Sequence, residues 1–230
     1  MKKIGQDKLK ELLSLYVVTD EKLSLGRPDP VVAGMAAAGG AGVIQLRAKE
    51  ASTRLLYEKA LAIKKEVTGK AVFIINDRLD VARAVDADGV HLGQDDLPAA
   101  VARRIWGPEK IIGVSVGSVE EALRAEADGA DYLGAGAIFA TPTKTDAQAI
   151  GLNGLEEICR AVNIPVVGIG GINKSNTPQI MAAGAAGVAV VSALVAAPDV
   201  TKAAAELLAV VQEKPAGFSC RQNLKNWSSR

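Results

Sequence analysis

Short runs of hydrophobic residues alternate along the chain with longer segments in which apolar and charged residues recur every three or four positions. The eight short runs cover residues 15–20, 43–47, 72–77, 89–93, 111–116, 132–136, 166–171 and 187–192. Most of them are apolar at successive positions rather than at alternate ones, which is typical of parallel strands buried on both faces. The pattern therefore predicts eight buried parallel strands.

The segments between these runs have the spacing of amphipathic helices. Ser52, Ser118 with Glu121 three residues later, and Asn176 before Thr177-Pro178 are expected to cap the N-termini of three of them. The predicted helices cover residues 53–67, 97–106, 118–127, 152–162, 177–184 and 198–213. Strands and helices thus alternate along nearly the whole chain.

An Ala/Asp-Gly joint recurs before several of the strands, as in AAGGAGVIQL, DADGVHL, EADGADYLG and MAAGAAGVAVV. Glycine at the end of a helix permits the left-handed turn back into the sheet. Eight β-then-α units without a break in composition predict an α/β protein with a single-domain (β/α)8 TIM barrel over residues 1–214. The alternative is an open doubly wound sheet. The non-periodic tail 215–230 is expected to be mobile or to form an interface segment.

Charge and composition narrow the classes of function. The 230 residues include 27 Lys and Arg against 26 Asp and Glu, which gives a net charge of +1, and the aromatic residues are three Phe, two Trp and three Tyr. Nucleic-acid binding usually requires an excess of basic charge or an aromatic stacking platform. We therefore expect no nucleic-acid partner.

Cysteine and histidine are scarce. Cys159 and Cys220 are the two cysteines and His91 is the single histidine, so neither a disulfide framework nor a zinc site of several Cys or His ligands is expected. The charged N-terminal segment does not resemble a signal peptide, and the uncharged stretch between Lys174 and Asp199 contains polar and helix-breaking residues. We expect a cytoplasmic protein without a membrane partner; the sequence leaves homo-oligomerisation open.

Polar side chains follow the predicted strands at one end, where the loops of a barrel meet in a common mouth. Gln45, Arg47 and Lys49 alternate after the second run and therefore share one face. Two cations on one face suit an anion with several charges, and Arg can bind it through two parallel hydrogen bonds. The alternative is that Arg47 and Lys49 only pair with neighbouring acids.

Two acidic residues follow adjacent predicted strands. Asp77 ends VFIIND and Asp96 lies in HLGQDD. Two such carboxylates can hold Mg²⁺ that takes its other ligands from water and a phosphate. The alternative is that Asp77 or Asp95 caps a following helix, and Asp95 is the better candidate for a cap.

Further polar positions complete the predicted mouth. Gly-rich turns at Gly170-Gly171 and at Val191-Ser192 can offer N–H groups to a phosphate, although the glycines could instead serve a tight turn. The segment after 136 carries Thr141, Thr143 and Lys144, which suit a lid over an anionic substrate. His91 has no evident Ser or Cys nucleophile beside it, so a hydrolase triad is unsupported; it could be a hydrogen-bonded barrel residue.

The motifs QLRAK, IIND, HLGQDD, GVS, IFATPTKTDA, GIGGI and VVSAL occur in this order. With them the chain resembles the thiamine-phosphate synthase family over about residues 15–198. That resemblance implies a Mg²⁺-dependent transferase of thiamine biosynthesis. It would join a hydroxymethylpyrimidine diphosphate to a thiazole phosphate and release diphosphate by a dissociative mechanism.

The resemblance also implies roles for individual residues. Gln45, Arg47, Lys49 and Asn76 would hold the pyrimidine diphosphate, Asp77 and Asp96 would bind Mg²⁺, and Ser115 would contact the pyrimidine. Thr141 and Thr143 would contact the thiazole phosphate, Lys144 the diphosphate, and Gly171, Val191 and Ser192 would form the phosphate cup. Among these, Arg47, Lys49, Ser115 and Lys144 are the expected catalytic residues.

Two alternatives remain on the same barrel. One alternative is a related thiazole tautomerase, which resembles this chain in the SVEEA segment. That relative carries a histidine where this chain has Gly117, and it lacks the paired acids. A non-catalytic barrel that binds a phosphorylated ligand is the second alternative. The acidic pair and the cationic motif argue against it, because phosphate binding alone needs no metal ligands.

Overall fold

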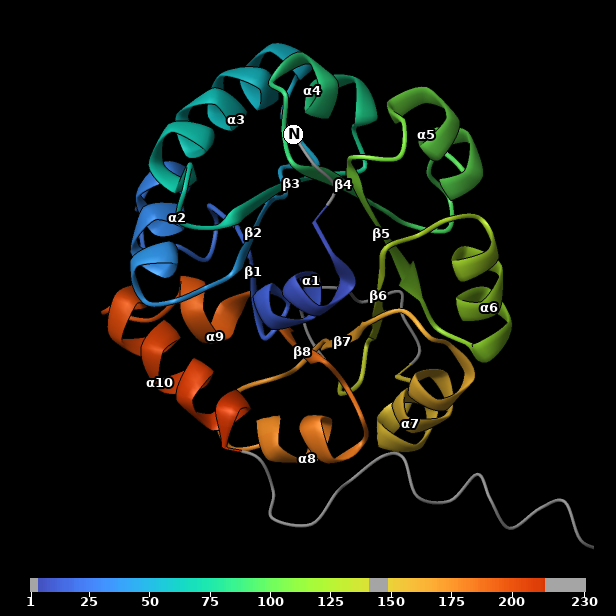
Figure 1. The fold of residues 1–230 in the computed structure, drawn as a ribbon. Helices are drawn as coiled ribbons and strands as arrows, with labels where there is room; N and C mark the ends of the chain where they lie inside the picture. Colours follow the sequence, from blue (N-terminus) through green and yellow to red (C-terminus); the bar gives the residue numbers. More distant parts are fainter. Residues whose placement is uncertain (1–3, 141–148, 214–230) are drawn as a thin grey trace, which may run out of the picture.

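The computed structural model describes residues 4–140 and 149–213, in which eight parallel strands close into a barrel (Figure 1). Each strand pairs with the next in the chain, and β1 pairs with β8. The strands are β1 (Leu15–Val18), β2 (Val43–Leu46), β3 (Val72–Asn76), β4 (Gly89–Leu92), β5 (Ile111–Val116), β6 (Tyr132–Gly136), β7 (Val166–Ile169) and β8 (Gly187–Val190). The predicted barrel is confirmed, and the open sheet is wrong because β1 and β8 are joined.

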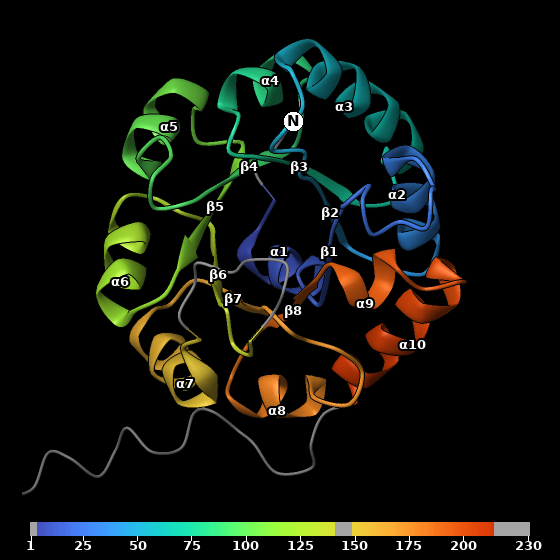
Figure 2. The same cartoon turned by 180° about the vertical axis from the view of Figure 1, so that it is seen from behind.

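A ring of helices surrounds the barrel, as both end-on views show (Figures 1 and 2). The ring contains α2 (Asp29–Ala38), α3 (Thr53–Val67), α4 (Leu79–Ala84), α5 (Ala99–Trp106), α6 (Val119–Ala127), α7 (Gly151–Ala161), α8 (Thr177–Ala182), the short α9 (Ser192–Val195) and α10 (Val200–Gln212). Within the described residues, no helix has both the length and the apolarity needed to cross a membrane. The predicted tail 215–230 lies outside the described residues.

Helix α1 (Gln6–Leu12) was not expected from the sequence. It lies over one open end of the barrel in Figure 1. Leu9 and Leu13 pack in one cluster with Val43, Val72 and Ile111, which begin strands β2, β3 and β5. Helix α1 therefore covers the N-terminal end of the barrel and leaves the C-terminal end for the site.

The hydrophobic core has two layers that follow the alternation of side chains along each strand. Leu15 and Val17 of β1 point outward into the large cluster beneath the helices, whereas Tyr16 and Val18 point into the barrel. Small residues on the inner faces of the helices, such as the fully buried Ala33, let these helices approach the strands closely. This packing explains why apolar residues occupy successive positions in most of the strand runs.

Two of the three predicted caps are present. Ser52 accepts a hydrogen bond from the Leu55 N–H at 3.3 Å, and Ser118 accepts one from the Glu121 N–H at 3.2 Å. Asn176 occupies the N-cap position of α8, but its side chain makes no capping hydrogen bond. That prediction was wrong because the Asn176 side chain binds the backbone of the preceding loop instead.

Candidate active site

A cavity of about 1140 Å³ opens at the C-terminal end of the barrel, the end seen in Figure 2. Each predicted site residue that the structure describes lines this cavity: Gln45, Arg47, Lys49, Asn76, Asp77, Asp96, Ser115, Gly171, Val191 and Ser192. The other predicted site residues, Thr141, Thr143 and Lys144, lie outside the described residues. The strand ends thus bring together groups from all parts of the sequence, as a parallel barrel requires.

The cationic side of the cavity follows β2. Gln45 is buried in the barrel, while Arg47 and Lys49 lie just beyond the end of the strand. Within residues 4–140 and 149–213, Arg47 makes no ion pair, and Lys49 Nζ lies 4.0 Å from Asp77 Oδ2 with its own side chain 60% exposed. Among the described residues, the alternative in which both cations only pair with neighbouring acids is therefore supported by one long contact of Lys49 and by no ion pair of Arg47.

Asp77 turns sharply at the end of β3. Its backbone has φ +61°, in the left-handed region, and its N–H donates to the His91 carbonyl at 2.8 Å. Burial, followed by the hydrogen bond and the charge of the adjacent Asp96 carboxylate, raises the pKa of the Asp77 carboxyl from 3.8 to about 6. The positive charges of Lys49 and Arg47 oppose that shift. Asp77 and Asp96 are thus close enough for their charges to interact strongly.

Asp96 is oriented by its own loop. Its Oδ2 accepts a hydrogen bond from the Gly93 N–H at 2.6 Å. The capping alternatives for Asp77 and Asp95 are wrong: the N-cap residues of α4 and α5 are Arg78 and Pro98, and neither helix has a side-chain cap. Asp95 is exposed.

Two carboxylates are too few ligands for a metal site made of protein side chains alone. No group of three or more Asp, Glu, His or Cys side chains is arranged to hold a metal within the described part of the chain. Mg²⁺ commonly binds to one or two carboxylates and completes its coordination with water and substrate phosphate oxygens. Two mutually repelling carboxylates beside cations suited to a phosphate fit that mode of binding.

The opposite wall of the cavity contains the predicted phosphate cup. Gly170 and Gly171 have φ +100° and +64°, and a Cβ atom on Gly171 would lie 2.8 Å from Cβ of Phe139. The Asn176 Nδ2 donates to the Gly171 carbonyl at 2.9 Å and so holds this turn. Beyond β8, Val191 is the N-cap residue of the short helix α9. The first N–H groups of a helix have no partner inside it, so this wall suits an anion.

His91 and Ser115 are joined in the centre of the site. His91 Nε2 lies 2.9 Å from Ser115 Oγ, and His91 Nδ1 lies 2.9 Å from the hydroxyl of Tyr132. His91 is thus a hydrogen-bonded barrel residue, as one of the two interpretations of the sequence held. Tyr16 and Tyr132 were not predicted as site residues, because both stand within apolar strand runs and have the sequence context of ordinary core residues.

Comparison with known proteins matches residues 15–194 to the family model described as thiamine monophosphate synthase. The chain is 57% identical to the thiamine-phosphate synthase of Chloroflexus aurantiacus over 206 residues, which cover 87% of this chain and 94% of that protein. It is also 57% identical to the thiamine-phosphate synthase of Moorella thermoacetica over 200 residues, 86% of this chain and 95% of that protein. This chain belongs to the thiamine monophosphate synthase family.

The fold agrees with this family too. The solved thiamine phosphate pyrophosphorylase from Pyrococcus furiosus has a TM-score of 0.83 and 49% identity, and the alignment covers 89% of this chain and 98% of that one. The family match runs from β1 to α9 and includes all the predicted site residues. The barrel and its mouth are therefore the parts that this synthase family shares.

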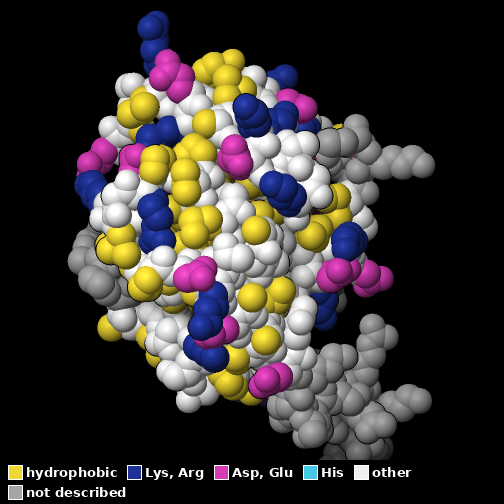
Figure 3. All heavy atoms as spheres, turned by 90° about the vertical axis from the view of Figure 1, so that its left-hand side faces the viewer, with side chains coloured by type: hydrophobic (Ala, Val, Ile, Leu, Met, Phe, Trp, Pro, Cys, Tyr) yellow, Lys and Arg dark blue, Asp and Glu magenta, His cyan; other side chains and the backbone are white. Residues whose placement is uncertain are grey.

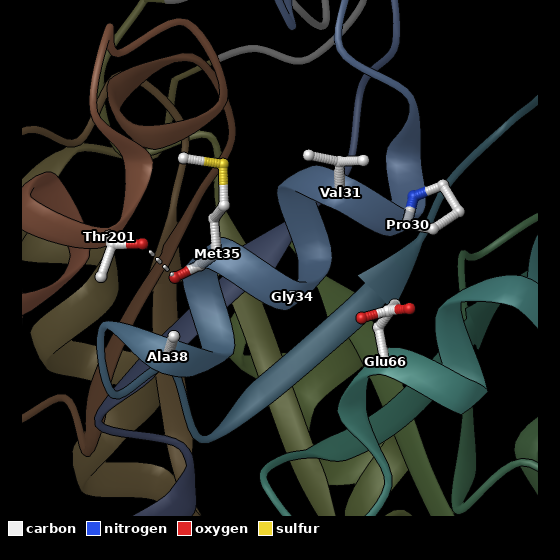
Figure 4. A pocket seen from close by; sticks show the side chains of 7 residues that line it. All are labelled: Pro30, Val31, Gly34, Met35, Ala38, Glu66 and Thr201. Atoms are coloured by element: carbon white, nitrogen blue, oxygen red, sulfur yellow. Dashed lines mark hydrogen bonds between the residues drawn. The ribbon is translucent and has the colours of Figure 1, made fainter.

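A second hollow, of about 390 Å³, lies on the outside of the barrel between α2, α3 and α10 (Figure 4). Glu66 is the titratable side chain in its lining, and the Thr201 hydroxyl donates to the Met35 carbonyl at 3.0 Å. On this side of the molecule, apolar side chains lie among scattered charges of both signs (Figure 3). The hollow lacks the paired acids and cations of the synthase mouth.

Proposed function

We propose that this member of the family is a transferase that joins 4-amino-2-methyl-5-hydroxymethylpyrimidine diphosphate to 4-methyl-5-(2-phosphoethyl)thiazole, giving thiamine phosphate and diphosphate. One observation carries the proposal: two carboxylates, Asp77 and Asp96, share a cavity with two cations, Arg47 and Lys49, at the end of neighbouring strands. A diphosphate is the leaving group that such a mixed set of charges suits.

The reaction we propose is dissociative. The bond between the pyrimidine methylene carbon and the diphosphate oxygen breaks, and both electrons leave with the diphosphate. The resulting methylene cation is stabilised by the amino-substituted ring, and the lone pair of the thiazole nitrogen forms the new carbon–nitrogen bond. No protein nucleophile is required. The expectation that no Ser lies beside His91 was wrong, because Ser115 Oγ lies 2.9 Å from His91 Nε2; His91 Nδ1, however, faces the Tyr132 hydroxyl and not the carboxylate of a hydrolase triad.

The residues of this chain act on the leaving group. The guanidinium of Arg47 and the ammonium of Lys49 bind the diphosphate and neutralise the charge that develops on it, an effect that is strongest where water is excluded. Asn76 lies at the end of β3 in the same wall and is proposed to contact the diphosphate. Asp77 and Asp96 would hold Mg²⁺, which supplies Lewis-acid stabilisation of the diphosphate when bound.

The second substrate is assigned to the opposite wall. The backbone of Gly171 and the Val191–Ser192 segment would bind the thiazole phosphate. From the segment after residue 140, Thr141 and Thr143 are proposed to contact the same phosphate, and Lys144 is proposed to contact the diphosphate. The two anions would then lie on opposite sides of the mouth. That separation would let the thiazole nitrogen approach the methylene cation from the side away from the departed diphosphate.

The tautomerase alternative is less well supported. The position at which the related tautomerase carries a histidine is Gly117 here, and Gly117 lines the cavity. The one histidine of this chain, His91, uses both ring nitrogens in hydrogen bonds to Tyr132 and Ser115. A barrel that only binds phosphate has no need for two close carboxylates, whose repulsion is unfavourable.

The deciding experiment incubates the purified chain with both substrates and follows diphosphate and thiamine phosphate together. The proposal predicts equal amounts of both products, no product in chelator, and recovery when Mg²⁺ is restored. Isomerisation of the thiazole without diphosphate release would identify a tautomerase instead. Binding of the phosphates without either reaction would identify a binding protein. Location in the cytoplasm stays a prediction from the sequence, and homo-oligomerisation stays open.

A further inference from the structure

A hydrogen-bonded chain of five side chains crosses the interior of the barrel. Gln45 Nε2 donates to the Tyr16 hydroxyl at 2.6 Å, and the hydroxyls of Tyr16 and Tyr132 lie 2.8 Å apart. The Tyr132 hydroxyl lies 2.9 Å from His91 Nδ1, and His91 Nε2 lies 2.9 Å from Ser115 Oγ. Gln45 and Ser115, the two ends, line the mouth cavity. The chain therefore links two proposed contacts of the pyrimidine that come from different strands.

The backbone makes room for this chain. A Cβ atom on Gly113 of β5 would lie 2.1 Å from Cζ of Tyr132, so any other residue there would displace the ring. A Cβ atom on Gly134 of β6 would lie 3.1 Å from Cε1 of His91. Burial also raises the pKa of both Tyr16 and Tyr132, which keeps their hydroxyls protonated. Both phenols therefore serve as neutral donors and acceptors.

The amide of Gln45 sets the direction of the donors. Because its NH₂ group donates to Tyr16, the Tyr16 proton needs another acceptor, and the Tyr132 oxygen is the one that the described residues offer. The Tyr132 proton then goes to His91 Nδ1, so the neutral imidazole carries its own proton on Nε2 and donates it to Ser115. The hydroxyl proton of Ser115 is left to point toward a ligand.

We propose that this hydrogen-bonded chain fixes His91 as its Nε2–H tautomer and thereby sets the hydrogen-bonding polarity of the pyrimidine subsite. In this subsite the Ser115 hydroxyl is the donor and the side-chain carbonyl oxygen of Gln45 is the acceptor. His91, Tyr16 and Tyr132 are positioning residues in this arrangement. The identity of the ligand rests on the proposed function, whereas the tautomer and the direction of the chain do not.

This polarity selects one class of heterocycle. In an aminopyrimidine the exocyclic amino group donates and the neighbouring ring nitrogen accepts, which matches an acceptor on Gln45 and a donor on Ser115. In the corresponding oxopyrimidine the exocyclic oxygen accepts and the ring N–H donates, so both contacts would be mismatched. Buried polar groups left unpaired are the strongest source of discrimination between analogues of equal size. The subsite should therefore prefer the amino form.

The first test measures the tautomer directly. His91 is the single histidine, so a tag-free sample labelled with ¹⁵N-histidine gives one imidazole in a long-range ¹H–¹⁵N correlation spectrum. We expect the neutral ring to carry its proton on Nε2. A proton on Nδ1 would overturn the proposal, because the chain would then run in the opposite direction and Ser115 would have to donate to His91.

Two variants test what sets the tautomer. In Gln45→Glu the carboxylate accepts from Tyr16 and reverses every bond, so the His91 proton should move to Nδ1. In Tyr132→Phe the donor to Nδ1 is lost, and both tautomers should be populated. Tyr57→Phe removes the hydroxyl of an exposed tyrosine on α3 and should leave the wild-type spectrum unchanged. An unchanged tautomer in folded Tyr132→Phe would also overturn the proposal, even if Gln45→Glu failed to fold.

A kinetic test addresses the selectivity. Tyr132→Phe should raise the KM for the aminopyrimidine diphosphate about tenfold, the factor that one ordinary hydrogen bond supplies, while the KM for the thiazole phosphate stays the same. Its preference for the amino over the oxo analogue should fall by a similar factor. Equal changes in the KM values for both substrates would show that Tyr132 has only a structural role. Absence of turnover in the wild type would refute the proposed function and leave the tautomer measurement intact.

Discussion

The ammonium nitrogen of Lys49 lies 4.0 Å from Oδ2 of Asp77, across the ends of β2 and β3. This contact is too long and too exposed on the lysine side to neutralise Asp77. Burial and the nearby Asp96 dominate instead and raise the Asp77 pKa to about 6. Without a bound cation, the acidic pair is therefore a source of instability in the native state.

Asp77→Asn should stabilise the protein in chelator at pH 7. Above pH 6 the native state has to ionise a carboxyl whose unfolded pKa is about 3.8, and one pKa unit corresponds to about 1.4 kcal/mol. We expect a gain of about 1–3 kcal/mol in the free energy of unfolding, measured by urea denaturation. Asparagine also tolerates the left-handed backbone of this position.

The same comparison has a defined pH dependence. A raised pKa of an acid disfavours the ionised native state, so the penalty in the wild type is absent below about pH 3.8, grows between 3.8 and 6, and is complete above 6. The difference between the wild type and Asp77→Asn should follow this course. Asp95→Asn, at an exposed neighbouring acid, serves as the control and should show no such difference.

Asp96→Asn should abolish most activity while the protein remains folded. Asparagine can still accept the hydrogen bond from the Gly93 N–H, so the loop keeps its shape, but one of the two proposed Mg²⁺ ligands is lost. A decrease in kcat of about 10²–10³ is the size seen when one electrostatic contact is removed from a transition state. Asp95→Asn should retain nearly normal turnover. The reverse ranking in a diphosphate-release assay would exchange the roles of the two neighbours.

The barrel could be predicted from the sequence because its strands are buried on both faces. Strands such as β1 (LYVV) and β8 (GVAV) carry hydrophobic or small residues at every position, and the Ala/Asp-Gly sequences mark where helices turn back into the sheet. Helix α1 was not predicted because Leu9, Leu12 and Leu13 stand among charged residues. These leucines are ordered by packing against the N-terminal end of the barrel. Local periodicity does not show such a long-range partner.

The site could be predicted in part for a similar reason. Once the strands are parallel, each residue that follows a strand must lie at the same mouth, which places Arg47, Asp77 and Ser192 together. The left-handed turn at Asp77 and the Tyr16–Tyr132 contact could not be predicted. These two tyrosines are 116 residues apart, and strand alternation gives the direction of a side chain but not its partner across the barrel.

Arg47→Lys should not preserve the function of Arg47. The guanidinium can bind two phosphate oxygens in parallel, whereas an ammonium cannot reproduce that geometry. Because Arg47 lies just after a rigid strand, we expect a higher KM for the pyrimidine diphosphate as well as a lower kcat, with a loss in kcat/KM of about tenfold or more. Steady-state kinetics would check this, and an unchanged KM would show that Arg47 does not bind the ground-state diphosphate.

Ser192→Ala and Gly171→Leu should weaken binding of the thiazole phosphate selectively. A side chain on Gly171 meets Phe139 at 2.8 Å and has to adopt φ +64°, so the cup must deform. Calorimetric titration of each substrate alone should show a loss of about tenfold or more for the thiazole phosphate and little change for the pyrimidine diphosphate. Equal losses for both ligands would place the cup elsewhere in the mouth.

Lys59→Met should destabilise the barrel without touching its mouth. Lys59 of α3 pairs with Asp29 of α2 at 2.8 Å and with Glu21, and the Asp29 side chain is 2% exposed. Burial raises the pKa of Asp29, and the ammonium of Lys59 opposes that shift. Removing the lysine leaves a buried carboxylate without a counter-charge, a change that typically costs about 3–5 kcal/mol.

The pH dependence of this loss separates a missing charge from a missing contact. As the pH falls and Asp29 becomes protonated, the uncompensated charge disappears, so the loss in Lys59→Met should shrink toward pH 4. Lys65→Met, at an exposed position on the same helix, is the control and should change the free energy of unfolding little at either pH. Urea denaturation at pH 7 and pH 4 gives the comparison. An equal loss at both values would mean that Lys59 stabilises α2 and α3 through the packing of its methylene groups rather than through its charge.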